Sequence, residues 1–110
     1  MTLRAGDLNR RVRIERNGGG VDDVGQPVDG WTEVATVWGN VRMLSGKETA
    51  QANADVGSAT ASIRIRYRTD ITNGMRAIVD GVTFNILQPL PNVAARDYTD
   101  LACSTGSNNG

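Results

Sequence analysis

The sequence contains no histidine, and Cys103 is the only cysteine among its 110 residues. Without histidine the chain lacks the side chain that most often serves as a general base, a metal ligand or a pH sensor near neutrality. A single cysteine cannot form a disulfide within the chain, and no neighbouring residue would lower the pKa of its thiol. We therefore expect Cys103 to act as a small buried hydrophobic residue.

Long apolar runs are also absent, and aromatic residues make up only 5% of the chain. No stretch is long enough to span a membrane and the start has no signal-peptide pattern, which predicts a soluble, intracellular protein without a membrane partner. The length fits a single domain over residues 1–110. Because Ala, Gly and Val dominate the apolar positions, the core is expected to be thin and the isolated domain only marginally stable.

Motifs for catalysis or cofactor binding are missing as well. The glycine-rich stretch 17–20 lacks the Lys-Ser/Thr and the helix of a phosphate-binding loop, and no zinc or dinucleotide pattern is present. The carboxylate pairs Asp22/Asp23 and Asp97/Asp100 lie beside turn residues, which is typical of solvated loops. The sequence therefore predicts a protein that is not an enzyme and that uses no cofactor or metal.

The stretch 61–68 alternates strictly between residues of two kinds. A period of two predicts a β-strand with one apolar face and one cationic face that carries Arg64, Arg66 and Arg68. The residues expected to face the core are Ala61, Ile63, Ile65 and Tyr67.

A β-hairpin is predicted shortly after this strand. Asp80-Gly81 is a dipeptide that two-residue type I′ turns favour, because both central residues need a positive φ. With this turn three apolar pairs fall on one side of the sheet, so turn chemistry and side-chain period agree. The predicted pairs are Val79 with Val82, Ala77 with Phe84, and Met75 with Ile86.

Three further strands complete the predicted fold. They cover residues 11–16, 31–43 and 97–104, and the second has a break in phase near Ala35 that predicts a β-bulge. Gly39 is a candidate for a tight bend, and the two tryptophans are interpreted as core and rim residues. The last strand faces the core through Thr99, Leu101 and Cys103, or alternatively through Tyr98, Asp100 and Ala102; the first set is preferred.

These strands indicate a mainly all-β fold, a small antiparallel barrel of about six strands with one long projecting loop. The lead-in 1–10 is anchored by Leu3 and Leu8, and residues 21–30 form an exposed excursion. The stretch 44–57 loses the period of two and is the segment expected to reach away from the body, as a short helix or a loop. Residues 104–110 are expected to be a flexible tail.

The charges sum to zero but are unevenly spread: residues 1–20 carry +3, residues 21–58 carry −4, and eleven of the twelve basic residues are Arg. One interpretation is an ordinary solvated surface, and the other is a basic face that meets an acidic face of a neighbouring subunit. The candidate interface residues are Arg11, Arg13, Arg64, Arg66, Arg68, Asp22 and Asp23. Alternatively, the Arg64/Arg66/Arg68 face could bind an oligonucleotide, although this face offers few aromatic residues for base stacking.

The order of several short motifs resembles the head–tail joining family of long-tailed bacteriophages and prophages, also called head-closure or stopper proteins. The resemblance covers nearly the whole chain. It is carried by AGDLNRRVRIER at 5–16, DDVGQPVDGWTEVATVWGNV at 22–41, SGKETAQA at 45–52, IRIRYR at 63–68 and VDGVTFNIL at 79–87. None of these motifs is a catalytic signature, and the match lies in their joint order and spacing.

This resemblance implies a structural protein of the virion that is made in the bacterial cytoplasm and acts at the head–tail junction. Its partners would be further copies of itself in a ring of six or twelve, the portal–adaptor complex, a tail-completion protein and, transiently, packaged DNA. The ring would retain the DNA and dock the tail. The family's projecting loop falls on 44–57, and its residues expected to face the channel or adaptor are Ser45, Gly46, Lys47, Glu48, Gln51, Asn53 and Asp55.

Overall fold

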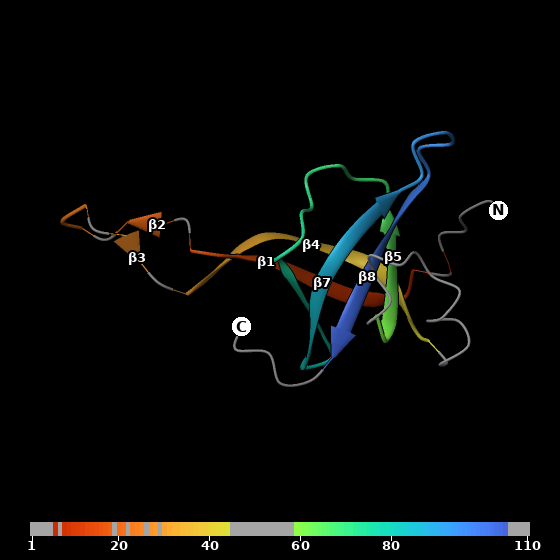
Figure 1. Cartoon of the computed structure of the whole chain (residues 1–110), viewed down its shortest axis with the longest axis horizontal. Helices are drawn as coiled ribbons and strands as arrows, with labels where there is room; N and C mark the ends of the chain where they lie inside the picture. Colours follow the sequence, from red (N-terminus) through yellow and green to blue (C-terminus); the bar gives the residue numbers. More distant parts are fainter. Residues whose placement is uncertain are drawn as a thin grey trace.

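The structure, a computed structural model, describes residues 6, 8–18, 20–21, 23–25, 27–28, 30–44 and 59–105. This part of the chain is built from strands (Figure 1). No helix in it is long and apolar enough to cross a membrane. The strands are β1 (Arg10–Asn17), β2 (Gly20–Val21), β3 (Pro27–Val28), β4 (Trp31–Met43), β5 (Ala61–Arg66), β6 (Arg76–Val79), β7 (Val82–Pro91) and β8 (Tyr98–Thr105).

Six of these strands close into an antiparallel barrel in the order β1-β4-β5-β8-β7-β6, which confirms the predicted fold class. Closure occurs because β1 pairs with β4 along its whole length and also with β6 at residues 13–15. Full closure leaves the paired parts of the strands without open edges.

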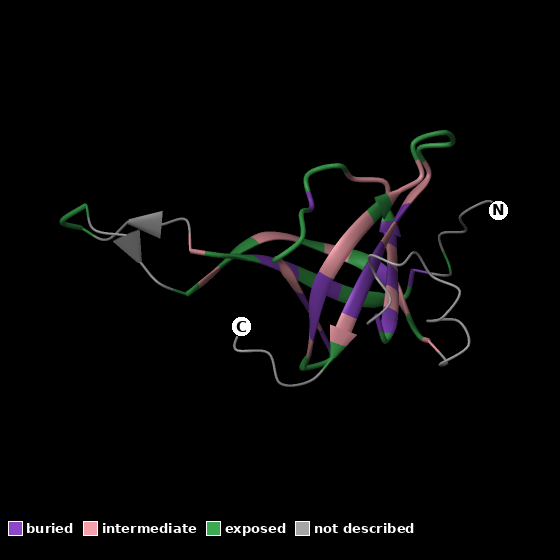
Figure 2. Cartoon of the chain, in the orientation of Figure 1, coloured by how far each residue is buried: buried purple, intermediate pink, exposed green. Residues whose placement is uncertain are grey.

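The core lies inside the barrel (Figure 2), and alternate residues of β5 and β6 are buried. Ile63 and Ile65 are fully buried, as the period of two predicted. In β8 the preferred inward set is confirmed, and Leu101 and Cys103 have no exposed surface. Leu8 is buried as an anchor of the lead-in, whereas Leu3 lies outside the described residues.

The β6–β7 hairpin has the predicted turn and register. Asp80 and Gly81 have φ values of 52° and 81°, so both occupy the left-handed region that a type I′ turn requires. Val79 pairs with Val82 and Ala77 with Phe84, and the amide of Ile86 donates a hydrogen bond to the carbonyl of Met75. Of these six residues, Val82 next to the turn is exposed, because no described strand covers the sheet there.

The predicted bulge in β4 is present. Ile14 pairs with Ala35 and the next residue, Glu15, pairs with Glu33, so Val34 is the extra residue. The bulge turns the side chain of Val34 against the core while Val37, farther along the strand, also packs there. A phase change within one long strand is how a small barrel keeps both halves of the strand covered.

Residues 18–30, which we call the arm, project from the barrel where the sequence predicts an exposed excursion over residues 21–30, and the predicted projection of 44–57 falls on residues that, from 45 onward, lie outside the described part of the chain. Figure 1 shows that this part of the chain leaves the barrel as a narrow extension, in which β2 pairs with β3. The arm forms because the β1–β4 ladder runs on to Asn17 and Trp31, beyond the barrel partners of both strands. The molecule is therefore elongated, with extents of 49 × 28 × 26 Å.

Smaller predictions are also corrected. Neither tryptophan belongs to the core: Trp31 is half-buried, and Trp38 is 51% exposed on the outside of the barrel. Gly39 is required for close packing, since a Cβ atom there would lie 2.8 Å from Val12 Cγ2. Strand β5 ends at Arg66, so Tyr67 is not part of it, and β8 continues to Thr105 into the predicted tail.

Candidate assembly interface

The predicted loop residues that face the channel or adaptor, from Ser45 to Asp55, lie outside the described residues, and so does Asp22. The structure does describe how the ends of this segment are held. Met43 pairs with Ala61, and the Leu44 amide donates a 2.9 Å hydrogen bond to the carbonyl of Thr60. The segment between them therefore leaves and re-enters the barrel at one place.

Arg64 has a partner within the subunit. Its Nε and Nη2 atoms donate hydrogen bonds of 2.7 and 2.9 Å to the two carboxylate oxygens of Asp100, directly opposite on β8. Its guanidinium also lies 3.7 Å from the ring centroid of Tyr98. The hydrogen bonds to Asp100 raise the pKa of Arg64. This bidentate, stacked geometry fixes the side chain, and the carboxylate of Asp100 occupies its Nε and Nη2 donors.

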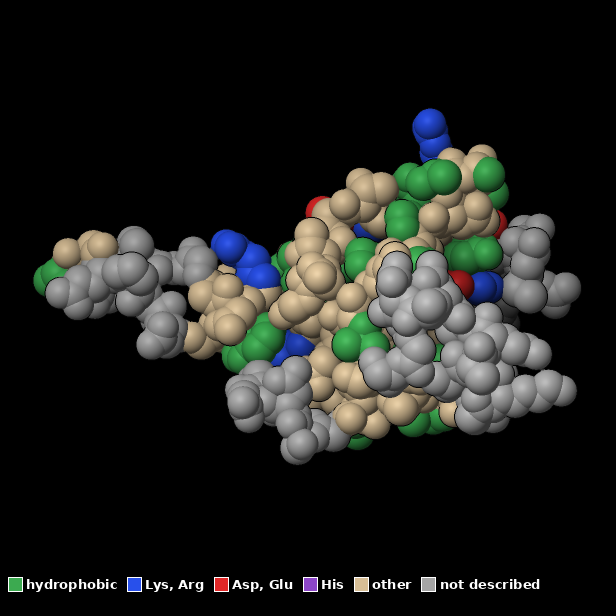
Figure 3. Space-filling view, in the orientation of Figure 1, with side chains coloured by type: hydrophobic (Ala, Val, Ile, Leu, Met, Phe, Trp, Pro, Cys, Tyr) green, Lys and Arg blue, Asp and Glu red, His purple; other side chains and the backbone are tan. Residues whose placement is uncertain are grey.

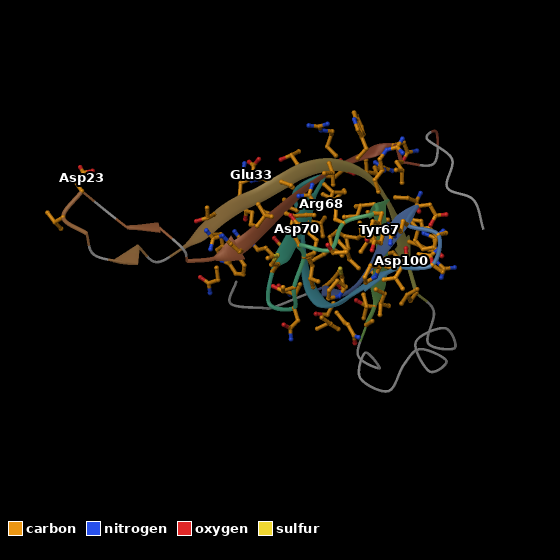
Figure 4. All side chains as sticks on the ribbon, turned by 90° about the horizontal axis from the view of Figure 1, so that it is seen from above. Asp23, Glu33, Tyr67, Arg68, Asp70 and Asp100 are labelled. Atoms are coloured by element: carbon orange, nitrogen blue, oxygen red, sulfur yellow. The ribbon has the colours of Figure 1, made fainter. Side chains whose placement is uncertain are left out.

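Arg68 is likewise neutralised inside the subunit. Its Nε and Nη2 atoms donate hydrogen bonds of 2.8 and 2.7 Å to Asp70, and the two residues lie near one another in Figure 4. These hydrogen bonds hold the pKa of Asp70 below its ordinary value. The backbone of Arg68 is fixed as well, since its amide donates to the hydroxyl of Thr99, which donates back to the Arg68 carbonyl. Two members of the predicted cationic ladder are therefore structural.

Arg13 belongs to a cluster around the buried Glu15 at the base of the arm, which we call the Glu15 cluster (Arg13, Glu15, Trp31, Arg76). Glu15 is only 5% exposed and accepts hydrogen bonds of 2.7 Å from Arg13 and 2.8 Å from Arg76. The guanidinium of Arg76 lies 4.2 Å from the ring centroid of Trp31. Figure 3 shows basic side chains gathered where the arm meets the barrel. The cluster joins β1, β4 and β6 at the base of the arm.

A row of cationic and aromatic residues crosses the outside of the barrel, and all but the half-buried Tyr98 are exposed. Arg11 on β1 pairs with Trp38 on β4, and Arg66 on β5 pairs with Tyr98 on β8. One position beyond the last β4–β5 pair, Gly39 with Ile65, the register places Trp38 opposite Arg66. We call these four residues the outer row. The prediction that few aromatic residues share a face with these arginines is therefore wrong.

The far end of the arm carries acidic and apolar residues. Figure 4 shows Asp23 at this end, far from Asp100 and Tyr67 on the barrel. Asp23 is exposed and the neighbouring Val24 is 76% exposed. Residues 18–30 contain three Asp and no Lys or Arg, so the arm carries a charge of −3 and the rest of the chain +3.

One end of the barrel has a shallow cavity of about 220 Å³. A 2.8 Å ion pair between Arg10 and Asp80 lies at its edge, and the remaining lining is apolar. Among the residues that the structure describes, no three His, Cys, Asp or Glu side chains come close enough to hold a metal ion. The apolar lining residues are Val41, Val79, Val82 and Phe84.

The buried thiol gives a prediction about pH. Burial raises the pKa of Cys103 to about 12, from an ordinary value of 9.0. Below pH 9 the thiol is protonated in both the folded and the unfolded chain, so its ionisation does not change the free energy of unfolding. Between pH 9 and 12 only the unfolded chain loses the proton, and the thiol should lower stability by about 1.4 kcal/mol per pH unit. Urea unfolding at pH 9 and above should show this slope, and Cys103→Ala should lack it. Equal slopes in both proteins would contradict the prediction.

Comparison with known proteins places this structure in a family. The family model for the phage head completion protein matches residues 3–106, which is almost the whole chain. The chain belongs to the phage head completion protein family. Head completion protein gp7 of Enterobacteria phage HK97 is 28% identical over 110 residues, which cover 96% of this chain and 98% of that protein.

Solved structures agree with the fold of this head completion protein. A protein of Shigella flexneri 2a, solved in solution, superposes with a TM-score of 0.77 at 33% identity, covering 97% of this chain and 100% of its own. A chain in the virion of a native gene transfer agent particle superposes with a TM-score of 0.57 at 21% identity, covering 90% of this chain and 97% of its own. The second likeness is one of fold alone.

Family membership confirms the resemblance drawn from the sequence motifs. The head completion protein is a structural protein of the virion that serves head closure at the head–tail junction, together with other structural proteins. The alternative of an oligonucleotide-binding barrel gains no support from the comparisons, and Arg64 and Arg68 of its proposed face are held by carboxylates of the same subunit.

Proposed function

We propose that this head completion protein works without catalysis or a cofactor, as one subunit of a ring of six or twelve copies beneath the portal–adaptor complex. The ring retains packaged DNA and presents a docking surface to a tail-completion protein. The observation that supports this most strongly is the elongated subunit, a closed barrel with an acidic arm on an otherwise basic body. A shape with different surfaces at its two ends favours head-to-tail contacts, and such contacts generate rings when they close.

Within the ring, segment 45–58 is proposed to face the channel or the adaptor, where Lys47 would be its only cation and could touch passing DNA. Its attachment supports this, because both ends are held together at the β4–β5 ladder. The segment can therefore serve an assembly contact without contributing to barrel closure. The residues proposed for this contact are Ser45, Gly46, Lys47, Glu48, Gln51, Asn53 and Asp55.

Deleting residues 45–56 tests this function. We expect the barrel to fold, because the deletion ends beside the hydrogen-bonded residues Leu44 and Thr60. Circular dichroism and urea unfolding should therefore resemble those of the full chain. A phage that lacks the gene and is complemented with this variant should produce heads that leak DNA and lack tails, seen by electron microscopy and nuclease sensitivity of the DNA.

The control is a variant in which residues 45–56 keep their length but are replaced by Gly and Ser, which separates the side chains from the chain length. Normal infectious particles from the deletion variant would contradict the proposed role of the segment. Normal particles in the complete absence of the protein would contradict the proposed function as a whole.

A further inference from the structure

We propose that the acidic arm of one subunit binds the outer row (Arg11, Trp38, Arg66 and Tyr98) of a neighbouring copy. This inference rests on the proposed ring and names the surfaces that would build it. The arm supplies Asp23 and the exposed Val24, together with the negative charge of residues 18–30. The outer row supplies the exposed indole of Trp38 and two arginines, whose positive charge is opposite to that of the arm.

The ion pairs within the subunit show which of the candidate arginines remain available to a neighbouring copy. Arg13, Arg64 and Arg68 are bound to Glu15, Asp100 and Asp70 of their own subunit. In the described part of the chain, no carboxylate pairs with Arg11 or Arg66, and both side chains are exposed. These two arginines therefore keep donors for an incoming carboxylate.

The composition of the outer row is that of a protein-binding surface. Trp, Tyr and Arg are the residues that most often dominate the binding energy of protein interfaces. Trp38 is 51% exposed in a protein with few aromatic residues, and Arg11 lies 4.8 Å from its ring centroid. Val24 of an incoming arm can cover the part of the indole that Arg11 leaves exposed while Asp23 pairs with Arg66, which joins an apolar contact to a charged one.

The arm that fills this surface belongs to a second copy. On the β1–β4 ladder, Trp38 is seven residues from Trp31, where the arm begins, and extended strand covers about 23 Å over that length. The arm leaves the barrel in the direction away from Trp38, since the ladder runs from Arg10 with Gly39 to Asn17 with Trp31. A subunit therefore offers its arm and its outer row to two different neighbours, as a ring requires.

A nucleic acid fits the outer row less well. Base stacking needs open aromatic faces, but Arg11 already lies over Trp38, and Arg64 lies over Tyr98 at 3.7 Å while bound to Asp100. A base would have to displace these guanidinium groups, whereas a carboxylate can bind their outer edges. Binding of a nucleic acid is therefore kept as an outcome of the test.

The test uses cysteine cross-linking and charge reversal in assembled particles. Cys103 is fully buried and does not compete, so Val24→Cys and Thr36→Cys combined in one chain should form disulfide-linked ladders of subunits under mild oxidation. Thr36 is exposed on β4 two residues from Trp38, so the indole stays in place. Two further variants add Arg66→Glu or Asp23→Arg to the double-cysteine chain. Each single reversal should reduce both the ladders and the yield of infectious particles by about tenfold or more, and the combination should restore most of the loss.

Arg96→Glu is the matched control, because Arg96 is an exposed arginine in the β7–β8 loop and is not part of the outer row. It should leave the ladders unchanged.

If the protein is required and present in particles but Arg66→Glu and Asp23→Arg change neither ladders nor yield, this inference fails while the proposed ring stands. If the protein is dispensable for closed heads, the proposed function fails. If Arg66→Glu instead abolishes salt-dependent binding of a single-stranded oligonucleotide and leaves the ladders intact, the outer row is a nucleic-acid site and the inference is overturned.

Discussion

Replacing Glu15 by Ala should lower the free energy of unfolding by about 3–5 kcal/mol, because the change leaves buried arginine charge without its carboxylate. The Arg76 side chain is 17% exposed and its Nε atom donates to Glu15 at 2.8 Å. Arg13 donates to the other carboxylate oxygen at 2.7 Å. The Arg76 charge is desolvated on folding and finds no replacement partner of that quality when the carboxylate is removed, whereas the Arg13 side chain is 52% exposed and stays in contact with water.

Urea unfolding followed by tryptophan fluorescence measures this effect, and Trp31 next to Arg76 makes the signal local. Glu33→Ala is the control, since Glu33 lies 3.6 Å from Arg13 and is largely exposed, and it should cost less than about 1 kcal/mol. Replacing both Glu15 and Arg76 by Leu should cost less than Glu15→Ala alone. Equal stabilities of Glu15→Ala and Glu33→Ala would contradict the role given to the Glu15 cluster.

Replacing Ile63 by Ala should cost about 2–5 kcal/mol, because the residue has no exposed surface and lies in the middle of β5. Its backbone pairs with Val41 on one side and Leu101 on the other, so the barrel cannot close around the cavity without moving two ladders. A loss of this size is a large part of the stability of a domain of 110 residues.

Ile63→Val removes a single methylene and should cost only about 0.5–1.5 kcal/mol, which tests whether the loss follows the volume removed. Val93→Ala is the exposed control, because Val93 is 65% exposed in the β7–β8 loop, and we expect almost no change. An Ile63→Ala protein as stable as the Val93→Ala protein would show that the barrel interior tolerates cavities and that the core is not tightly packed.

The strands could be predicted from the sequence because their signals are local. Alternation along 61–66 depends only on which side chains must avoid water, and the Asp80-Gly81 turn depends only on the φ values that two residues tolerate. The bulge near Ala35 was visible for the same reason, as a change of phase within one strand. Each of these features is decided by neighbours within a few residues.

The sequence predicted residues 21–30 only as an exposed excursion, and it did not predict that residues 18–30 extend away from the barrel as a paired arm. Whether the turn-rich stretch 18–30 folds back or extends depends on where β1 and β4 lose their barrel partners, β6 and β5. Those limits are set by pairing between segments far apart in the sequence. That segment 44–57 also reaches away from the body stays a prediction, since its residues from 45 onward lie outside the described part of the chain.

The candidate interface was also only partly predictable from the sequence. Arg64 and Arg66 have the same residue type, the same strand and the same outward face, so the sequence assigned both to one cationic ladder. Only the register of β8 distinguishes them, because it places Asp100 opposite Arg64 and Tyr98 opposite Arg66. The outer row was hidden for the same reason, since its four residues come from four strands and meet only when the barrel closes.

The sequence by itself determined the kind of protein, an antiparallel barrel, and the family to which its motif order belongs. The tertiary structure alone decided which charges are used within the subunit and which remain for a neighbour, and which segment reaches outward. The physical reason is the difference in sequence separation between the residues that interact. Strand and turn preferences act between residues adjacent in the chain, whereas a charge is neutralised by whatever the fold brings within a few ångströms of it.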